Sequence, residues 1–173
     1  MATNLIFKLL GAALIVVGTT LFGKTYAKIF KDRVDFLTDF NKRLEIVKNE
    51  IGFMKGILVD VINRAGEFPG SAKELFEEMR DNLEHMEACS AWETACEKIF
   101  TKLTLKDEDV ETVRSLGRLL GVSDVDGQIT NIEAVSGQVG VLIESAETER
   151  KKNEPLFKSL GPLVGVGIAI FLM

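Results

Sequence analysis

The chain has 173 residues, of which 46% are hydrophobic and 27% charged, so it is long and apolar enough for a folded core and is not a disordered chain. Its net charge of −5 argues against binding to the phosphate backbone of nucleic acids, and two cysteines are too few for a disulfide-rich scaffold. The charges are unevenly spread: Lys8 is the only charged side chain before Lys24, and none follows Lys158.

The N-terminal segment is apolar over the length of a membrane span. Residues 3–23 carry one charge, on Lys8, and a helix of this length is roughly 31 Å long, close to the thickness of a bilayer's hydrocarbon core. A cleaved signal peptide is the alternative, but the basic region before it is thin and no small-residue cleavage site follows Phe22. We therefore expect a transmembrane helix over residues 1–23.

The C-terminal segment, residues 156–173, is apolar in the same way, with Lys158 as its only charge. As a helix it is about 27 Å long, which suffices if Lys158 lies at the headgroup level. A buried core helix is the alternative, but the last 15 residues are all uncharged, which favours a second span. Gly161 and Gly165 are four residues apart, a spacing that permits close helix packing in lipid and that also arises by chance.

Basic residues border both apolar segments on the side of the intervening chain. They are Lys24, Lys28, Lys31 and Arg33 after the first segment, and Arg150, Lys151, Lys152 and Lys158 around the start of the second. The positive-inside rule predicts that residues 24–155 are cytoplasmic and that both termini lie across the membrane. In the reducing cytoplasm Cys89 and Cys96 would be free thiols.

Helical periodicity runs through residues 24–155. The first helix is expected to continue directly out of the N-terminal span, with one apolar face formed by Phe30, Val34, Leu37, Phe40, Leu44, Val47 and Ile51. Gly52 and Gly56 predict a break after it. A short helix is then expected from Ile57 to Gly66, followed by a loop at residues 67–70.

Capping signals predict four further helix starts, at Ser71, Ser90, Thr104 and Ser123. Gly121 fits the left-handed position that ends the helix starting at Thr104. The expected apolar faces include Leu75, Phe76, Met79, Leu83 and Met86; Ile99, Phe100 and Leu103; Val110, Val113, Leu116, Leu119 and Leu120; and Ile129, Ile132, Val135, Val139, Leu142, Ile143 and Ala146. No alternating strand pattern intervenes. The predicted fold is therefore all-α, an antiparallel bundle of about six helices between two transmembrane helices.

No combination of residues typical of a catalytic, cofactor or metal site is present in the sequence. His85 stands alone on a polar helix face, and Cys89 and Cys96 lack partners at zinc-ligand spacing and are interpreted as small core residues. We therefore expect a protein that is not an enzyme. The net charge of −6 between Lys24 and Lys158 would suit a basic partner, although by itself it is better explained by the ordinary solubility of a bundle surface.

Several short motifs follow one another along the chain: Lys8–Ala12 with Ile15–Val17, Ala27–Ile29, Leu44 with Glu50–Ile51, Ala91–Glu93, Leu103–Lys106, Leu116–Gly121 with Asp124, Gln128 and Ile132, Asn153–Glu154, and Lys158–Gly161. In this order and spacing they resemble the stage III sporulation protein AB family of endospore-forming bacteria over nearly the whole length. Three positions depart from the family pattern. Leu116 stands in place of Phe, Met54–Leu58 replaces a Thr-Pro-Leu-like helix start, and Pro155 replaces a helix-compatible residue, which predicts a kink.

The resemblance implies a component of the channel-like complex between mother cell and forespore, similar in its cytoplasmic helical domain to the platform proteins of type II secretion and type IV pilus machines. It implies a location in the mother-cell membrane, no cofactor, and contacts with a secretion-type ATPase, stage III sporulation protein AA, and with other membrane components of the complex; self-association is left open. The family-signature or partner-contact positions would be Trp92, Gly117, Gly121, Asp124 and Gln128, and the transmembrane packing positions Gly161 and Gly165. The alternative is a membrane-anchored regulatory bundle that binds an unrelated cytoplasmic partner.

Overall fold

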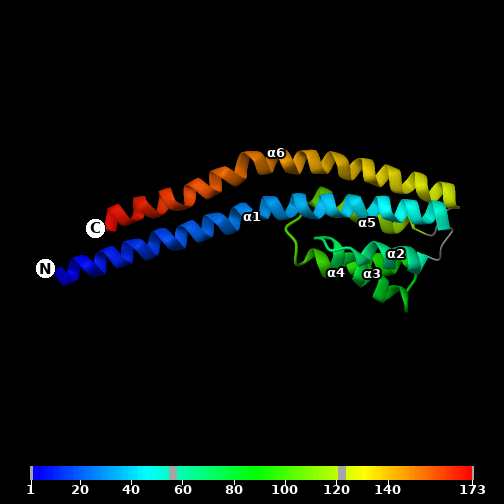
Figure 1. Cartoon of the computed structure of the whole chain (residues 1–173), viewed down its shortest axis with the longest axis horizontal. Coiled ribbons are helices and arrows are strands. Elements are labelled where there is room, and N and C mark those ends of the chain that lie inside the picture. The colour runs from blue at the N-terminus through cyan, green and yellow to red at the C-terminus, as the bar shows by residue number, and fades with distance from the viewer. Residues whose placement is uncertain (1, 55–57, 121–123, 173) are drawn as a thin grey trace. The chain divides into compact units, whose positions relative to one another are not determined.

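A computed structural model describes residues 2–54, 58–120 and 124–172 (Figure 1). These residues form six α-helices and no strand, which confirms the all-α prediction. The helices are α1 (Ala2–Met54), α2 (Leu58–Glu67), α3 (Lys73–Leu83), α4 (Ala88–Phe100), α5 (Asp107–Leu119) and α6 (Val125–Leu172).

The chain divides into two compact units, and α1 and α6 each contribute to both of them. We call Met1–Lys31 with Ala146–Met173 the helical pair, and Asp32–Ser145 the bundle. The boundaries of these units differ from the expected limits of the membrane spans, at residues 23 and 156, and those limits stay a prediction.

The core of the bundle is built on the apolar face of α1. Val34, Leu37, Phe40, Leu44, Val47 and Ile51 are all buried, as the periodicity predicts. Helices α2 to α5 pack consecutively, α2 on α3, α3 on α4 and α4 on α5. The first part of α6 runs antiparallel to α1, because Ser136 donates a hydrogen bond to Asn41 (2.8 Å) while Glu133, nearer the start of α6, pairs with Lys48 (3.6 Å).

Two of the predicted helix starts are wrong in detail. Helix α3 begins at Lys73, and its N-cap residue is Ala72 rather than Ser71. The Ala72 amide instead donates to the Asp39 carboxylate of α1 (2.8 Å), so a residue distant in sequence supplies the capping acceptor. Helix α4 begins at Ala88, so Ser90 lies inside its first turn and does not cap it.

The other two starts are shifted by one or two residues. Helix α5 begins at Asp107 rather than directly after Thr104, and the Lys106 amide donates to the Asp109 carboxylate (2.9 Å). Asp124 caps α6 by accepting a hydrogen bond from the Gly127 amide (3.0 Å). The predicted cap Ser123 and the predicted C-terminal Gly121 lie outside the described residues.

The remaining boundaries agree with the sequence to within a few residues. Helix α1 ends at Met54, within the break predicted at Gly52–Gly56, and α2 ends at Glu67, one residue beyond Gly66. Gly56 and Ile57 are outside the described residues. Helix α6 continues through Pro155 and Pro162, and the kink expected at Pro155 stays a prediction.

Two side chains expected in the core are exposed. Met86 lies beyond the end of α3 and is 44% exposed, because the helix stops before the apolar spacing does. Cys89 in the first turn of α4 is exposed, whereas Cys96, two turns later on the inner face, is buried.

The helical pair carries the exposed apolar surface that a membrane span requires. Two helices are long and apolar enough to cross a membrane, α1 in its N-terminal part and α6 in its C-terminal part. Their exposed large apolar side chains are Leu9, Leu10, Leu14, Val17, Leu21, Phe22, Leu156, Leu160, Leu163, Val164, Val166, Ile168, Ile170, Phe171 and Leu172. A helix of a soluble core would bury such side chains, so this exposure favours lipid as their environment.

Candidate functional site

Trp92 is the central side chain of the bundle. Its indole ring is completely buried, with the ring of Phe76 edge-on at 5.7 Å and that of Phe40 at 6.1 Å between centroids. The buried indole N–H donates to the carbonyl of Val113 on α5 (3.0 Å), which satisfies its only polar group. Trp92 therefore connects α1, α3, α4 and α5.

Gly117 lies directly against this indole. A Cβ atom at position 117 would be 2.9 Å from Cγ and 3.0 Å from Cβ of Trp92. Because a buried indole cannot move away as the end of a flexible side chain can, α5 approaches α4 this closely only with glycine at this position. The contacts of Trp92 and Gly117 thus lie inside the bundle.

A buried ion pair ties α1 to the start of α5. Arg33 is 5% exposed and Asp109 is fully buried, and the guanidinium binds the carboxylate in a bidentate manner at 2.7 and 2.8 Å. Glu108 lies 3.4 Å from the same guanidinium. Carboxylates in the first turn of a helix are also favoured by the helix dipole. The charge on Asp109 is therefore stabilised both by the Arg33 guanidinium and by the N-terminus of α5.

A second charged pair on α1 holds the connection between α2 and α3. Arg43 is buried, binds Asp39 at 3.0 Å, and donates to the carbonyl groups of Ala65 and Phe68 near the end of α2. A cation is favoured at the carbonyl end of a helix. Since Asp39 also accepts a hydrogen bond from the backbone amide of Ala72, the residue before α3, this one pair contacts the end of α2 and the start of α3.

The other expected signature positions lie near the start of α6. Asp124 is exposed and acts as the helix cap described above. Gln128, one turn later, is half-buried, and its backbone amide donates to the Asp124 carbonyl (2.9 Å). Gly121 is outside the described residues. Partner contact at any of these positions stays a prediction.

The histidine and the cysteines are the side chains that the sequence offered for possible metal or nucleophilic chemistry. No group of three or more His, Cys, Asp or Glu side chains among the described residues is placed to hold a metal ion. His85 is 79% exposed and lies 4.0 Å from the Glu84 carboxylate. Burial raises the pKa of the Cys96 thiol to about 12, so it is protonated and unreactive near neutral pH.

The two units carry opposite charge. The helical pair has eight Lys and Arg residues against three Asp and Glu, a formal charge of +5, and the bundle has 13 against 23, a charge of −10. Exposed carboxylates gather at the start of α5, at Asp107, Glu108 and Glu111. Such a distribution attracts a basic partner to the bundle and anionic groups to the helical pair.

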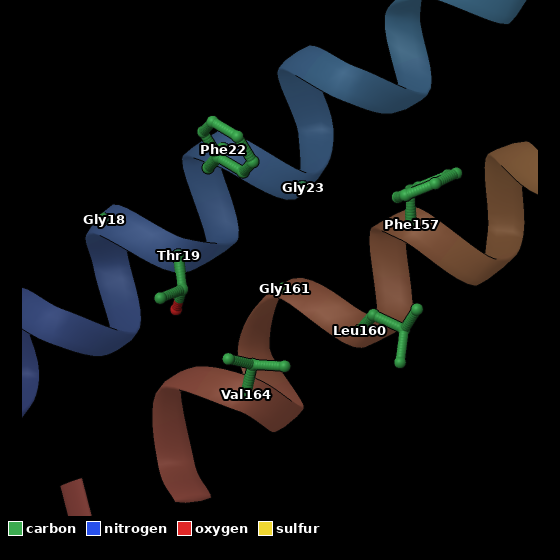
Figure 2. Close-up of a pocket in the computed structure, with 8 residues that line it drawn as sticks. All are labelled: Gly18, Thr19, Phe22, Gly23, Phe157, Leu160, Gly161 and Val164. Atoms are coloured by element: carbon green, nitrogen blue, oxygen red, sulfur yellow. The ribbon is translucent and has the colours of Figure 1, made fainter. Parts of the chain in front are cut away.

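The helices of the pair touch through glycine (Figure 2). A Cβ atom at Gly161 would be 2.7 Å from the Thr19 carbonyl oxygen, and one at Gly165 would be 2.8 Å from Cα of Val16. On the opposite helix, a Cβ atom at Gly23 would be 3.1 Å from Cα of Gly161. The two backbones therefore approach as closely as small residues allow, with α1 and α6 antiparallel.

Three comparisons place this arrangement among known proteins. The sequence model described as stage III sporulation protein AB matches residues 8–173. Stage III sporulation protein AB of Bacillus subtilis (strain 168) is 31% identical over 169 residues, which cover 96% of this chain and 99% of that protein. The chain belongs to the stage III sporulation protein AB family.

A solved structure of stage III sporulation protein AB supports the fold of this family member. It matches with a TM-score of 0.65 at 21% identity, and covers 70% of this chain and 98% of that chain. Membership in the family supports a role as a component of a sporulation complex, and the family is one of structural sporulation proteins rather than a known enzyme family. With two helices of membrane-spanning length, it also supports a membrane location.

The sequence did not reveal the packing roles of three residues in this family member. They are Gly23, which touches α6, and Arg33 and Arg43, which form buried ion pairs. A signal for the two arginines existed, because Arg33 is four residues before Leu37 and Arg43 three residues after Phe40, on the apolar side of α1. A charge at a core-facing position indicates a buried partner. Gly23 gave no such signal, since the first span also contains Gly11 and Gly18, whose Cβ positions have no atom within 4 Å.

Proposed function

We propose that this protein is a non-enzymatic platform in the mother-cell membrane of a sporulating bacterium. Its bundle would present a docking surface in the cytoplasm to a secretion-type ATPase, stage III sporulation protein AA. The helical pair would hold that surface at the membrane, next to other components of a channel-like complex between mother cell and forespore.

The observation that carries the proposal is the division of the chain into two units of different chemistry. One unit has exposed apolar helices and a charge of +5, which suits a membrane with cations on the cytoplasmic side, and the other is a water-exposed bundle with a charge of −10. Both units share α1 and α6, each an unbroken helix. A docking site that is covalently continuous with two spans is what a platform requires.

Binding of the ATPase tests the proposal. Full-length protein in lipid nanodiscs is expected to bind the purified ATPase, more weakly as salt rises, because the attraction between the acidic bundle and a basic surface is screened. Neutralising the exposed carboxylates at the start of α5 (Asp107→Asn, Glu108→Gln, Glu111→Gln together) is expected to weaken binding, and the same number of neutralisations at Asp81, Glu84 and Glu87 serves as the matched control. Binding that is absent at low salt would favour the alternative, a regulatory bundle with another cytoplasmic partner.

A further inference from the structure

An apolar groove remains open between the two helices of the pair where the glycines bring them together (Figure 2). It has a volume of about 370 Å³. The lining residues are Gly18, Thr19, Phe22 and Gly23 of α1 and Phe157, Leu160, Gly161 and Val164 of α6.

The groove offers carbon and almost no hydrogen-bonding group to an occupant. The only polar side chain that lines it is Thr19, and its hydroxyl already lies 3.0 and 3.1 Å from the carbonyl oxygens of Ile15 and Val16 in the preceding turn. The space beside Gly18 is open, because a Cβ atom at this position would have no neighbour within 4 Å. Such a surface accepts a flexible hydrocarbon chain without leaving a polar group unsatisfied.

One end of the groove is bordered by both aromatic rings and basic side chains. The ring of Phe157 lies 4.7 Å from that of Tyr26 and 5.9 Å from that of Phe30, an aromatic cluster of the kind found at the headgroup level. Lys24 and Lys158 directly follow the lining residues Gly23 and Phe157 in sequence, and both are exposed. An apolar groove that ends beside aromatic rings and exposed cations is complementary to an acyl chain that ends in a negatively charged headgroup.

We propose that this groove binds one acyl chain of an anionic phospholipid, with its phosphate held near Lys24, because Lys158 already binds the Glu154 carboxylate at 2.6 Å. The charge of +5 on the helical pair, from eight basic and three acidic residues, selects a negative headgroup over a zwitterionic one. The inference rests on the membrane location in the proposed function. A third helix is a poorer fit, since it is about 10 Å wide and gains nothing from the cations at the end of the groove.

Lipid retention by the full-length protein tests the inference. Native mass spectrometry in detergent would compare phosphatidylglycerol with phosphatidylcholine of the same acyl chains. We expect phosphatidylglycerol to be retained more strongly. Gly18→Leu, which adds a side chain at an open Cβ position that lines the groove, is expected to lower retention of both lipids by about tenfold, and Lys24→Gln to lower the preference for phosphatidylglycerol by about fivefold.

Gly167→Leu is the matched control, because Gly167 also has open space at its Cβ position but does not line the groove. Equal retention of the two lipids by the wild type, or an equal loss in Gly167→Leu and Gly18→Leu, would overturn the inference. Loss of a dimer in Gly18→Leu with unchanged lipid retention would also overturn it, in favour of a second copy in the groove. Carbonate extraction separates the two proposals: release of the protein from membranes contradicts the proposed function, whereas retention without lipid selectivity contradicts only the lipid site.

Discussion

At the scale of single residues, the bundle depends on a few positions where no other side chain satisfies the same contacts. Gly117 leaves room for the Trp92 indole, and the buried Arg33 and Arg43 bind the carboxylates of Asp109 and Asp39. Removing one member of such a contact leaves either a clash or an uncompensated buried charge.

The contact between Gly117 and Trp92 predicts that Gly117→Ala destabilises the bundle by about 1–3 kcal/mol, because the added methyl group overpacks the core. Gly137→Ala is the matched control, since its Cβ position is open and alanine favours a helix over glycine by about 1 kcal/mol. Thermal unfolding of the full chain in detergent, followed by circular dichroism, measures both. An unchanged or higher melting temperature for Gly117→Ala would show that α4 and α5 are not packed as closely as described.

The pair of Arg33 and Asp109 predicts that Asp109→Ala lowers the free energy of unfolding by about 3–5 kcal/mol, since it leaves the guanidinium buried without its partner. The double variant Arg33→Met with Asp109→Leu is expected to recover most of that loss, because it removes both charges. Asp107→Ala, an exposed carboxylate in the same helical turn, is the control and is expected to change stability by less than about 1 kcal/mol. Denaturant unfolding of the three variants gives the comparison, and a double variant as unstable as Asp109→Ala would refute the argument.

At the scale of the helix, α6 carries a line of ion pairs just before its apolar segment. Glu154 binds Lys158 at 2.6 Å and Arg150 at 2.7 Å, each one helical turn away. These contacts order the charged side chains of α6 where the chain would enter the headgroup region.

Hydrogen bonding from Lys158, and then from Arg150, lowers the pKa of Glu154 to about 2. Because the pKa in the folded protein lies below the ordinary 4.5, the contribution of these pairs is present in full above about pH 4.5 and is lost as the pH falls toward 2. Carbon-13 NMR of labelled glutamate in micelles measures the titration. Lys158→Gln is expected to raise the pKa of Glu154 more than Arg150→Gln does, and a wild-type value near 4.5 would show that the pairs do not form.

At the scale of the whole molecule, the distribution of charge bears on topology. All basic residues of the helical pair except Lys8 border the apolar segments on the bundle side, which predicts a cytoplasmic bundle. Cys89 reports on this directly, because it is exposed, whereas Cys96 is buried and its raised pKa of about 12 keeps it unreactive.

We expect a membrane-impermeant maleimide to leave Cys89 unlabelled in intact cells and to label it in inverted vesicles. Mass spectrometry of the recovered protein identifies the modified residue, and Cys89→Ser should abolish the labelling seen in inverted vesicles. Rapid labelling of Cys89 in intact cells would reverse the predicted orientation.

The sequence by itself determined the helical class, the approximate helix boundaries and the two apolar segments. It did so because periodicity and hydrophobic length are local properties: the face from Val34 to Ile51 is visible in the spacing alone. The family resemblance, carried by motifs in order, was also available from the sequence and is confirmed by the comparisons.

Only the tertiary structure decided which local signals are used. Ser71 and Ser90 have the sequence of caps, yet the Ala72 amide is bound by Asp39, 33 residues earlier, because packing brings a better acceptor to it. Gly161, Gly165 and Gly167 are the same residue type on one helix, but of these three only Gly161 and Gly165 pack against the backbone of α1. Contacts between residues distant in the chain depend on how whole helices pack, and no local pattern contains that information.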